Sequence, residues 1–131
     1  MQSAAALTTV AANASGASSI ALGDSATAPN AGDVNIGDGN TIATKSILPG
    51  DVVIGQGNSS TAVNGGGNIL IGKDNEITQN EQGIAVGRGN TISRGNHTIF
   101  GSGNTTSSQY GQLVLGDNNT STVEQLSLIH I

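Results

Sequence analysis

A short apolar motif recurs along this chain, and residues 84–93 are its clearest copy. It reads apolar, variable, apolar, glycine, variable, turn residue, asparagine. Its first glycine aligns at Gly23, Gly37, Gly55, Gly72, Gly87, Gly101 and Gly116. Successive glycines lie 14 to 18 residues apart, which is too short for a helical hairpin or a propeller blade. Two short strands and two turns fit, so we expect an all-β fold, a parallel β-solenoid of seven coils. At about 4.8 Å per coil it would form a rod about 34 Å long.

Two columns before the aligned glycine are almost entirely apolar. Positions are counted from that glycine. Position −1 holds Leu22, Ile36, Ile54, Ile71, Val86, Phe100 and Leu115. Position −3 holds Ile20, Val34, Val52, Ile69, Ile84, Thr98 and Leu113. Side chains two residues apart share one face of a strand, and these types suit a half-buried strand. We therefore expect both columns to line the interior.

The column at position −2 then has the parity of the outer face. It holds Ala21, Asn35, Val53, Leu70, Ala85, Ile99 and Val114. A solvated strand face is normally polar, and a continuous apolar stripe is typical of a partner surface. Because every coil repeats the stripe, we expect a homotrimer interface made by Ala21, Val53, Leu70, Ala85, Ile99 and Val114. The alternative is ordinary β-propensity with tolerated exposure. On this interpretation Leu70→Asp dissociates the oligomer and Ile71→Asp unfolds the coil.

The residues after the glycine predict a tight corner. Position +2 holds Ser25, Gly39, Gly57, Asp74, Gly89, Gly103 and Asn118, types that tolerate positive φ or bond locally to the backbone. Position +3 holds Ala26 in the first coil and then Asn40, Asn58, Asn75, Asn90, Asn104 and Asn119. Stacked asparagines can form a ladder of side-chain amides. Position +5 shares their inward parity and is smaller and more polar, which predicts a narrow tube.

The repeat predicts three regions. Residues 1–18 would form an imperfect N-terminal coil or cap, and residues 19–122 the repeats. Residues 123–131 would be a tail outside the repeat, whether a further strand, the start of another domain or a non-native end. Extra residues in the two longest intervals, within 45–50 and 64–68, would emerge as loops on one face.

Composition removes several classes of function. The net charge is −5 with only four basic residues, which argues against nucleic-acid binding. Cysteine is absent, so disulfides and thiolate zinc sites are excluded. Apolar runs are three or four residues long, against the roughly 20 that a membrane span needs. We therefore expect no direct membrane insertion by this segment.

The first coil carries a resemblance to a known family. The run Ser19-Ile20-Ala21-Leu22-Gly23, followed by Ala26-Thr27-Ala28, resembles the head repeat of YadA-like trimeric autotransporter adhesins, roughly Ser-Val-Ala-Ile-Gly and then Ala-x-Ala. The later Gly-x-Gly-Asn coils are a looser form, so the resemblance covers about residues 12–122. Intervals of 17 and 18 residues depart from the family's regular 14.

The resemblance implies a left-handed β-roll packed as three parallel chains at the bacterial surface. Anchorage in the outer membrane would come through a region outside this chain. The implied function is attachment to host extracellular matrix or to a cell-surface receptor, as in virulence-associated cell adhesion.

Catalytic and metal chemistry have little support. His97 and His130 lie in unlike contexts without a recurrent Asp and nucleophile. A calcium array would need repeated oxygen ligands, but position +1 mixes Asp24, Asp38, Gln56, Lys73, Arg88, Ser102 and Asp117. The Gly-x-Gly segments lack the strand–turn–helix context of phosphate loops. We expect no catalytic residue, metal or cofactor.

Two alternative functions remain open. Outward positions +4 and +6 carry mostly Thr and Ser, which could order water as an ice-binding face. These are Thr41 and Ala43, Ser59 and Thr61, Glu76 and Thr78, Thr91 and Ser93, Thr105 and Ser107, and Thr120 and Thr122. Thr is also simply a good strand residue. A trimeric phage tail fibre segment would have a similar fold and a host-surface receptor.

Overall fold

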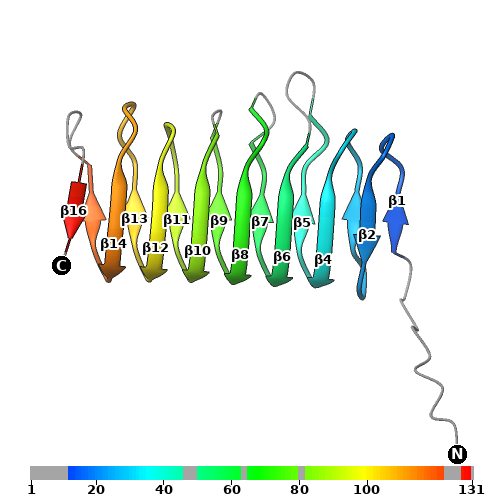
Figure 1. The fold of residues 1–131 in the computed structure, drawn as a ribbon, viewed down its shortest axis with the longest axis horizontal. Helices are drawn as coiled ribbons and strands as arrows, with labels where there is room; N and C mark the ends of the chain where they lie inside the picture. The colour runs from blue at the N-terminus through cyan, green and yellow to red at the C-terminus, as the bar shows by residue number, and fades with distance from the viewer. Residues whose placement is uncertain (1–11, 46–49, 63–64, 80–81, 123–127, 131) are drawn as a thin grey trace, which may run out of the picture.

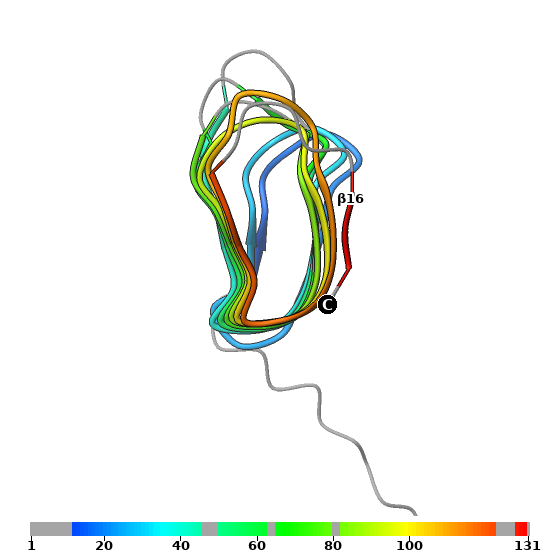
Figure 2. The same ribbon diagram turned by 90° about the vertical axis from the view of Figure 1, so that its left-hand side faces the viewer.

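The computed structural model describes residues 12–45, 50–62, 65–79, 82–122 and 128–130. Within these ranges the regular secondary structure is β-strand alone, and every strand pair is parallel. The chain winds into the β-solenoid that the repeat predicts (Figure 1). Seen along the rod, the coils superpose as a flattened ring with two long walls (Figure 2).

The first wall is an eight-stranded sheet that carries the apolar motif. Its strands are β2 (Ile20–Leu22), β4 (Val34–Asp38), β6 (Val52–Gln56), β8 (Ile69–Lys73), β10 (Ile84–Arg88), β12 (Thr98–Ser102), β14 (Leu113–Asp117) and β16 (Leu128–His130). The register places Gly72 opposite Gly87 and Gly87 opposite Gly101. Each position of the repeat therefore forms a straight column along the rod.

The second wall consists of two-residue strands at positions +4 and +5. A six-stranded sheet contains β5 (Thr41–Ile42), β7 (Ser59–Ser60), β9 (Glu76–Ile77), β11 (Thr91–Ile92), β13 (Thr105–Thr106) and β15 (Thr120–Ser121). A separate pair joins β1 (Asn13–Ala14) to β3 (Thr27–Ala28). Pairing thus begins within the predicted N-terminal cap; residues 1–11 lie outside the described ranges.

The C-terminal strand, β16, belongs to the first wall. Leu128, Ile129 and His130 pair in parallel with Leu113, Val114 and Leu115 of β14. Residues 128–130 therefore form a further strand, which is one of the alternatives that the sequence leaves open for the tail, while 123–127 and 131 lie outside the described residues. Sheet pairing uses backbone groups, so a strand can join the wall without the glycine and asparagine that follow it in other coils.

The inner and outer columns of the first wall are the reverse of the prediction. Position −2 points inward: Val53, Leu70, Ala85, Ile99 and Val114 are fully buried within one chain, and Ala21 is half-buried. With Ile42, Ile77 and Ile92 of the second wall, the first five form the hydrophobic core. The prediction that position −2 faces outward as a trimer interface is wrong.

The narrow interior explains this reversal. Inward positions of the first wall are position −4, which is polar except at Gly83, position −2, which is apolar except at Asn35, and the aligned glycine. An interior lined by −3 and −1 would instead hold two large aliphatic side chains per coil opposite position +5. The observed parity places those larger side chains outside, where no facing wall limits their volume.

Candidate interaction surface

The outer face of the larger sheet is almost entirely apolar from β2 to β14. It consists of positions −3 and −1 from β2 to β14, and we call it the apolar sheet face. Thirteen of its fourteen side chains are apolar, Thr98 is the exception, and none is charged. The columns that were predicted to fill the interior therefore form the largest apolar feature outside the core.

The side chains of this face are only partly accessible. Ile20, Leu22, Ile71 and Phe100 are 37% to 52% exposed, and the others are half-buried. Coils rise about 4.8 Å per layer, so each side chain is flanked closely by its neighbours above and below. The face is thus a closely packed layer of aliphatic side chains whose outer ends meet solvent in the single chain.

The second wall provides an internal comparison. Its outward positions at +4 are Thr41, Ser59, Glu76, Thr91, Thr105 and Thr120. Thr, Val and Ile all favour strands, so strand propensity does not explain why one wall is polar and the other apolar. A polar outer face suits solvent, whereas a continuous apolar one is typical of a surface that another molecule covers.

A mixed polar column borders the apolar sheet face at position +1. Lys73 and Arg88 are register partners near its middle. Acidic residues stand towards both ends, at Asp24, Asp38 and Asp117. Apolar contact surfaces in protein interfaces commonly have such a polar rim. The first wall therefore combines an apolar outer face with a mixed polar border.

The asparagine column forms the ladder that the sequence predicts. Asn90 Oδ1 accepts hydrogen bonds from Asn104 N (3.1 Å) and Asn104 Nδ2 (3.0 Å). Asn90 Nδ2 donates to Asn75 Oδ1 (2.9 Å) and to Gly101 O (2.7 Å). Equivalent bonds between successive asparagines run from Asn40 to Asn119. The ladder satisfies polar groups that are buried at every corner.

The corner also requires its glycines. The aligned glycines have φ between 121° and 138°. A Cβ atom on any of the first six would lie 1.7–2.0 Å from the carbonyl oxygen of the next aligned glycine. The position +2 residues all have φ between 55° and 66°, including Ser25, Asp74 and Asn118. The tight corner is therefore where the sequence predicts it.

A buried polar column at position −4 was missed from the sequence. Asp33, Asp51, Asn68, His97 and Gln112 lie inside the coil. Asp33, for example, accepts hydrogen bonds at Oδ1 from Asp51 N (2.9 Å) and at Oδ2 from Asn30 Nδ2 (2.8 Å). These side chains hold the turn opposite the asparagine corner. The spacing relates this column to position −2, two residues away, but the sequence does not show that this shared face is the inner one.

The two candidate histidines lie in different parts of the fold. His97 is 1% exposed, and its Nε2 lies 3.1 Å from Ser108 O. His130 lies in β16. Among the described residues no group of three or more His, Asp or Glu is positioned to hold a metal ion. The described part of the chain also contains no helix long and apolar enough to cross a bilayer.

We compared the chain with family models, with curated proteins and with solved structures, and none of the three comparisons produced a match.

Proposed function

We propose that this chain is a non-catalytic head segment of a trimeric bacterial surface adhesin. Three copies pack side by side through the apolar sheet face, and the assembled rod attaches to host extracellular matrix or to a cell-surface receptor. The observation that supports this is the outer face of the larger sheet, where thirteen of fourteen side chains are apolar. The number of copies and the adhesive role rest on the resemblance of the first coil.

Self-association accounts for the face better than a dissimilar partner does. Every coil presents the same two apolar positions, so each copy offers a matching surface along the whole rod, and homo-oligomers with closed symmetry are the common solution. Burying one aliphatic side chain fully is worth about 1.5–3 kcal/mol. Association costs roughly 4–15 kcal/mol. Because the side chains are already partly covered, the contact has to extend over most of the coils.

Trimer assembly would also explain how the rod attaches to a host surface through weak contacts. The polar second wall carries exposed Thr and Ser at Thr41, Thr61, Ser107 and Thr120, so it stays hydrated when the apolar face is covered. Three copies held in one rigid rod present each weak contact three times. Multivalent binding can exceed the affinity of one contact by about 10²–10⁴. Strong single sites are then unnecessary.

Light scattering in solution tests the assembly. We expect three times the chain mass for the wild type. Ile71→Asp places a charge on the apolar sheet face and should give a folded monomer. Thr41→Asp places the same charge on the second wall and should remain trimeric. A monomeric wild type, or an Ile71→Asp variant that stays trimeric, contradicts the proposed interface.

Attachment needs its own measurement. Beads carrying the trimer should bind surfaces coated with extracellular matrix or whole host cells, and beads carrying equal amounts of Ile71→Asp should bind more weakly because avidity is lost. A trimer that binds none of these surfaces would contradict the adhesive role while leaving the assembly intact.

Ice binding is the second candidate, and the Thr and Ser columns of the second wall favour it. Thermal hysteresis of freezing is the direct test. Glu76 interrupts the column at its centre, so Glu76→Thr should increase the hysteresis if this wall binds ice. An absence of hysteresis in both proteins removes this candidate.

A further inference from the structure

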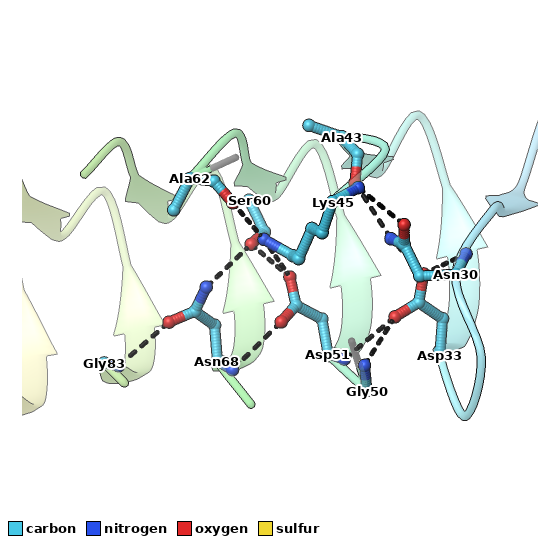
Figure 3. A network of polar contacts seen from close by, with 10 residues as sticks. All are labelled: Asn30, Asp33, Ala43, Lys45, Gly50, Asp51, Ser60, Ala62, Asn68 and Gly83. Carbon is cyan, nitrogen blue, oxygen red and sulfur yellow. Dashed lines mark hydrogen bonds and ion pairs between the residues drawn. The ribbon is translucent and has the colours of Figure 1, made fainter. Parts of the chain in front are cut away.

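One basic side chain lies inside the solenoid. Lys73, Arg88 and Arg94 are exposed, but the side chain of Lys45 is fully buried against that of Asp51, which is also fully buried. Lys45 Nζ lies 3.1 Å from Asp51 Oδ2. Figure 3 shows both side chains within the network of buried polar groups in the interior.

Each polar side-chain atom of Lys45 and Asp51 has a hydrogen-bond partner. Asp51 Oδ1 accepts a hydrogen bond from Asn68 N (3.0 Å). Asp51 Oδ2 accepts one from the Ser60 hydroxyl. Lys45 Nζ donates to Ala62 O. The amine and the carboxyl group are therefore held together by groups from three successive coils (Figure 3).

We propose that Lys45 and Asp51 condense to form an intramolecular amide cross-link. A proton passes from the Lys45 ammonium group to Asp51 Oδ2, and the neutral amine nitrogen attacks Asp51 Cγ. The Cγ–Oδ2 bond then breaks, and Oδ2 leaves as water with a second proton from the nitrogen. One ammonium and one carboxylate become one amide and one water, so no oxidant, reductant or further reactant is consumed.

The surrounding hydrogen bonds suit both the reaction and its product. Ser60 donates its hydroxyl hydrogen to Oδ2, the oxygen that leaves. In the product, Oδ1 becomes the amide oxygen and still accepts from Asn68 N, while the remaining N–H still faces Ala62 O. Only the departing oxygen loses its bonds. The polar groups that hold the ion pair are thus already those that an amide requires.

Burial supplies the driving force. Two buried charges carry a large desolvation penalty, and the amide removes both. Amide formation is unfavourable in dilute water, but reacting groups held in contact behave as if present at about 10⁵–10⁸ M. The bond would connect the segment after β5 to the residue before β6, within the 18-residue interval from Gly37 to Gly55. The proposal does not depend on trimer assembly.

The intact mass of the purified, then denatured chain tests this directly. We expect it to be lower than the sequence mass by one water, and a protease digest to contain one branched peptide joining residues 45 and 51. Lys45→Arg should have its full sequence mass, because a guanidinium group does not condense. Lys73→Arg, a control on the surface, should keep the loss. A wild type with its full mass overturns the proposal.

One other reaction removes the same mass. Asp38 precedes Gly39, and an aspartyl residue before glycine can cyclise to a succinimide with loss of water. A succinimide would persist in Lys45→Arg and would disappear after mild base, whereas the amide persists in base and is absent from Lys45→Arg. A loss that survives in Lys45→Arg, or that mild base reverses, overturns the cross-link.

Discussion

Each coil after the first turns at its short corner through two residue types that others replace poorly, the aligned glycine and the asparagine three positions later. The glycine has no space for a side chain, because its Cβ position is occupied by the carbonyl group of the next coil. The asparagine bonds the coil before it and the coil after it through one side chain. Corner geometry is thus specified residue by residue.

Two glycines of one coil should respond differently to the same methyl group. At Gly87 an added Cβ would lie 1.8 Å from Gly101 O, whereas at Gly89 it meets nothing within 4 Å. Gly87→Ala should lower the free energy of unfolding by more than about 4 kcal/mol. Gly89→Ala should cost only about 1–2 kcal/mol, for its left-handed backbone. Chemical denaturation measures both, and equal losses would contradict the clash.

The asparagine ladder should also be sensitive to substitution. Asn90→Ala removes the acceptor of Asn104 N and leaves a buried N–H unpaired, which costs about 1–3 kcal/mol for each such group. Asn96, which is exposed in a turn, is the matched control, and Asn96→Ala should change stability by less than about 0.5 kcal/mol. The same denaturation experiment distinguishes them. A neutral Asn90→Ala would mean that the ladder contributes little.

These corner residues could be predicted from sequence because their chemistry is local. Residue types that tolerate positive φ, and a run of asparagines that can stack, are each recognisable in a single column of the repeat. The buried polar column was not recognisable in this way, since Asp51, Asn68 and His97 share no residue type. Their common role follows only from their position inside the coil.

At the scale of the strand, parity decides which side chains form the core. The sequence predicts the strands, their period and their parallel stacking, because glycine and asparagine mark where each strand ends. It does not determine which face of the first wall is inside, because three consecutive positions, −3 to −1, are all largely apolar. Alternation cannot orient a strand that lacks a polar face. Only closure of the ring against the second wall selects position −2 for the interior.

Charges placed on two adjacent residues of β8 should reveal which of them faces the interior. Leu70 is fully buried and Ile71 is 38% exposed. Leu70→Asp should unfold the coil, because an unpaired carboxylate in an apolar interior is very costly. Ile71→Asp should keep its β-sheet spectrum. Circular dichroism of the two variants measures the outcome. This expected outcome is the reverse of the one that the sequence alone predicts. A folded Leu70→Asp variant would indicate that position −2 faces outward after all.

At the scale of the molecule, stability and assembly should be linked. If three chains cover one another's apolar faces, unfolding also separates them, and the melting temperature should rise with protein concentration. For Ile71→Asp it should be independent of concentration. Calorimetry over a hundredfold concentration range measures both. A wild-type melting temperature that does not change with concentration would contradict a trimer held by this face.

Parallel, in-register stacking makes the length of the rod adjustable in whole units. Residues 87–100 span 14 positions, from one aligned glycine to the residue before the next. Their removal joins Val86 to Gly101 and restores the motif, so the remaining coils keep the same neighbour contacts. We expect the shortened protein to fold and, by small-angle scattering, to be shorter by about 4.8 Å. Loss of one coil or gain of another can therefore change how far the rod extends without altering the chemistry of the remaining coils.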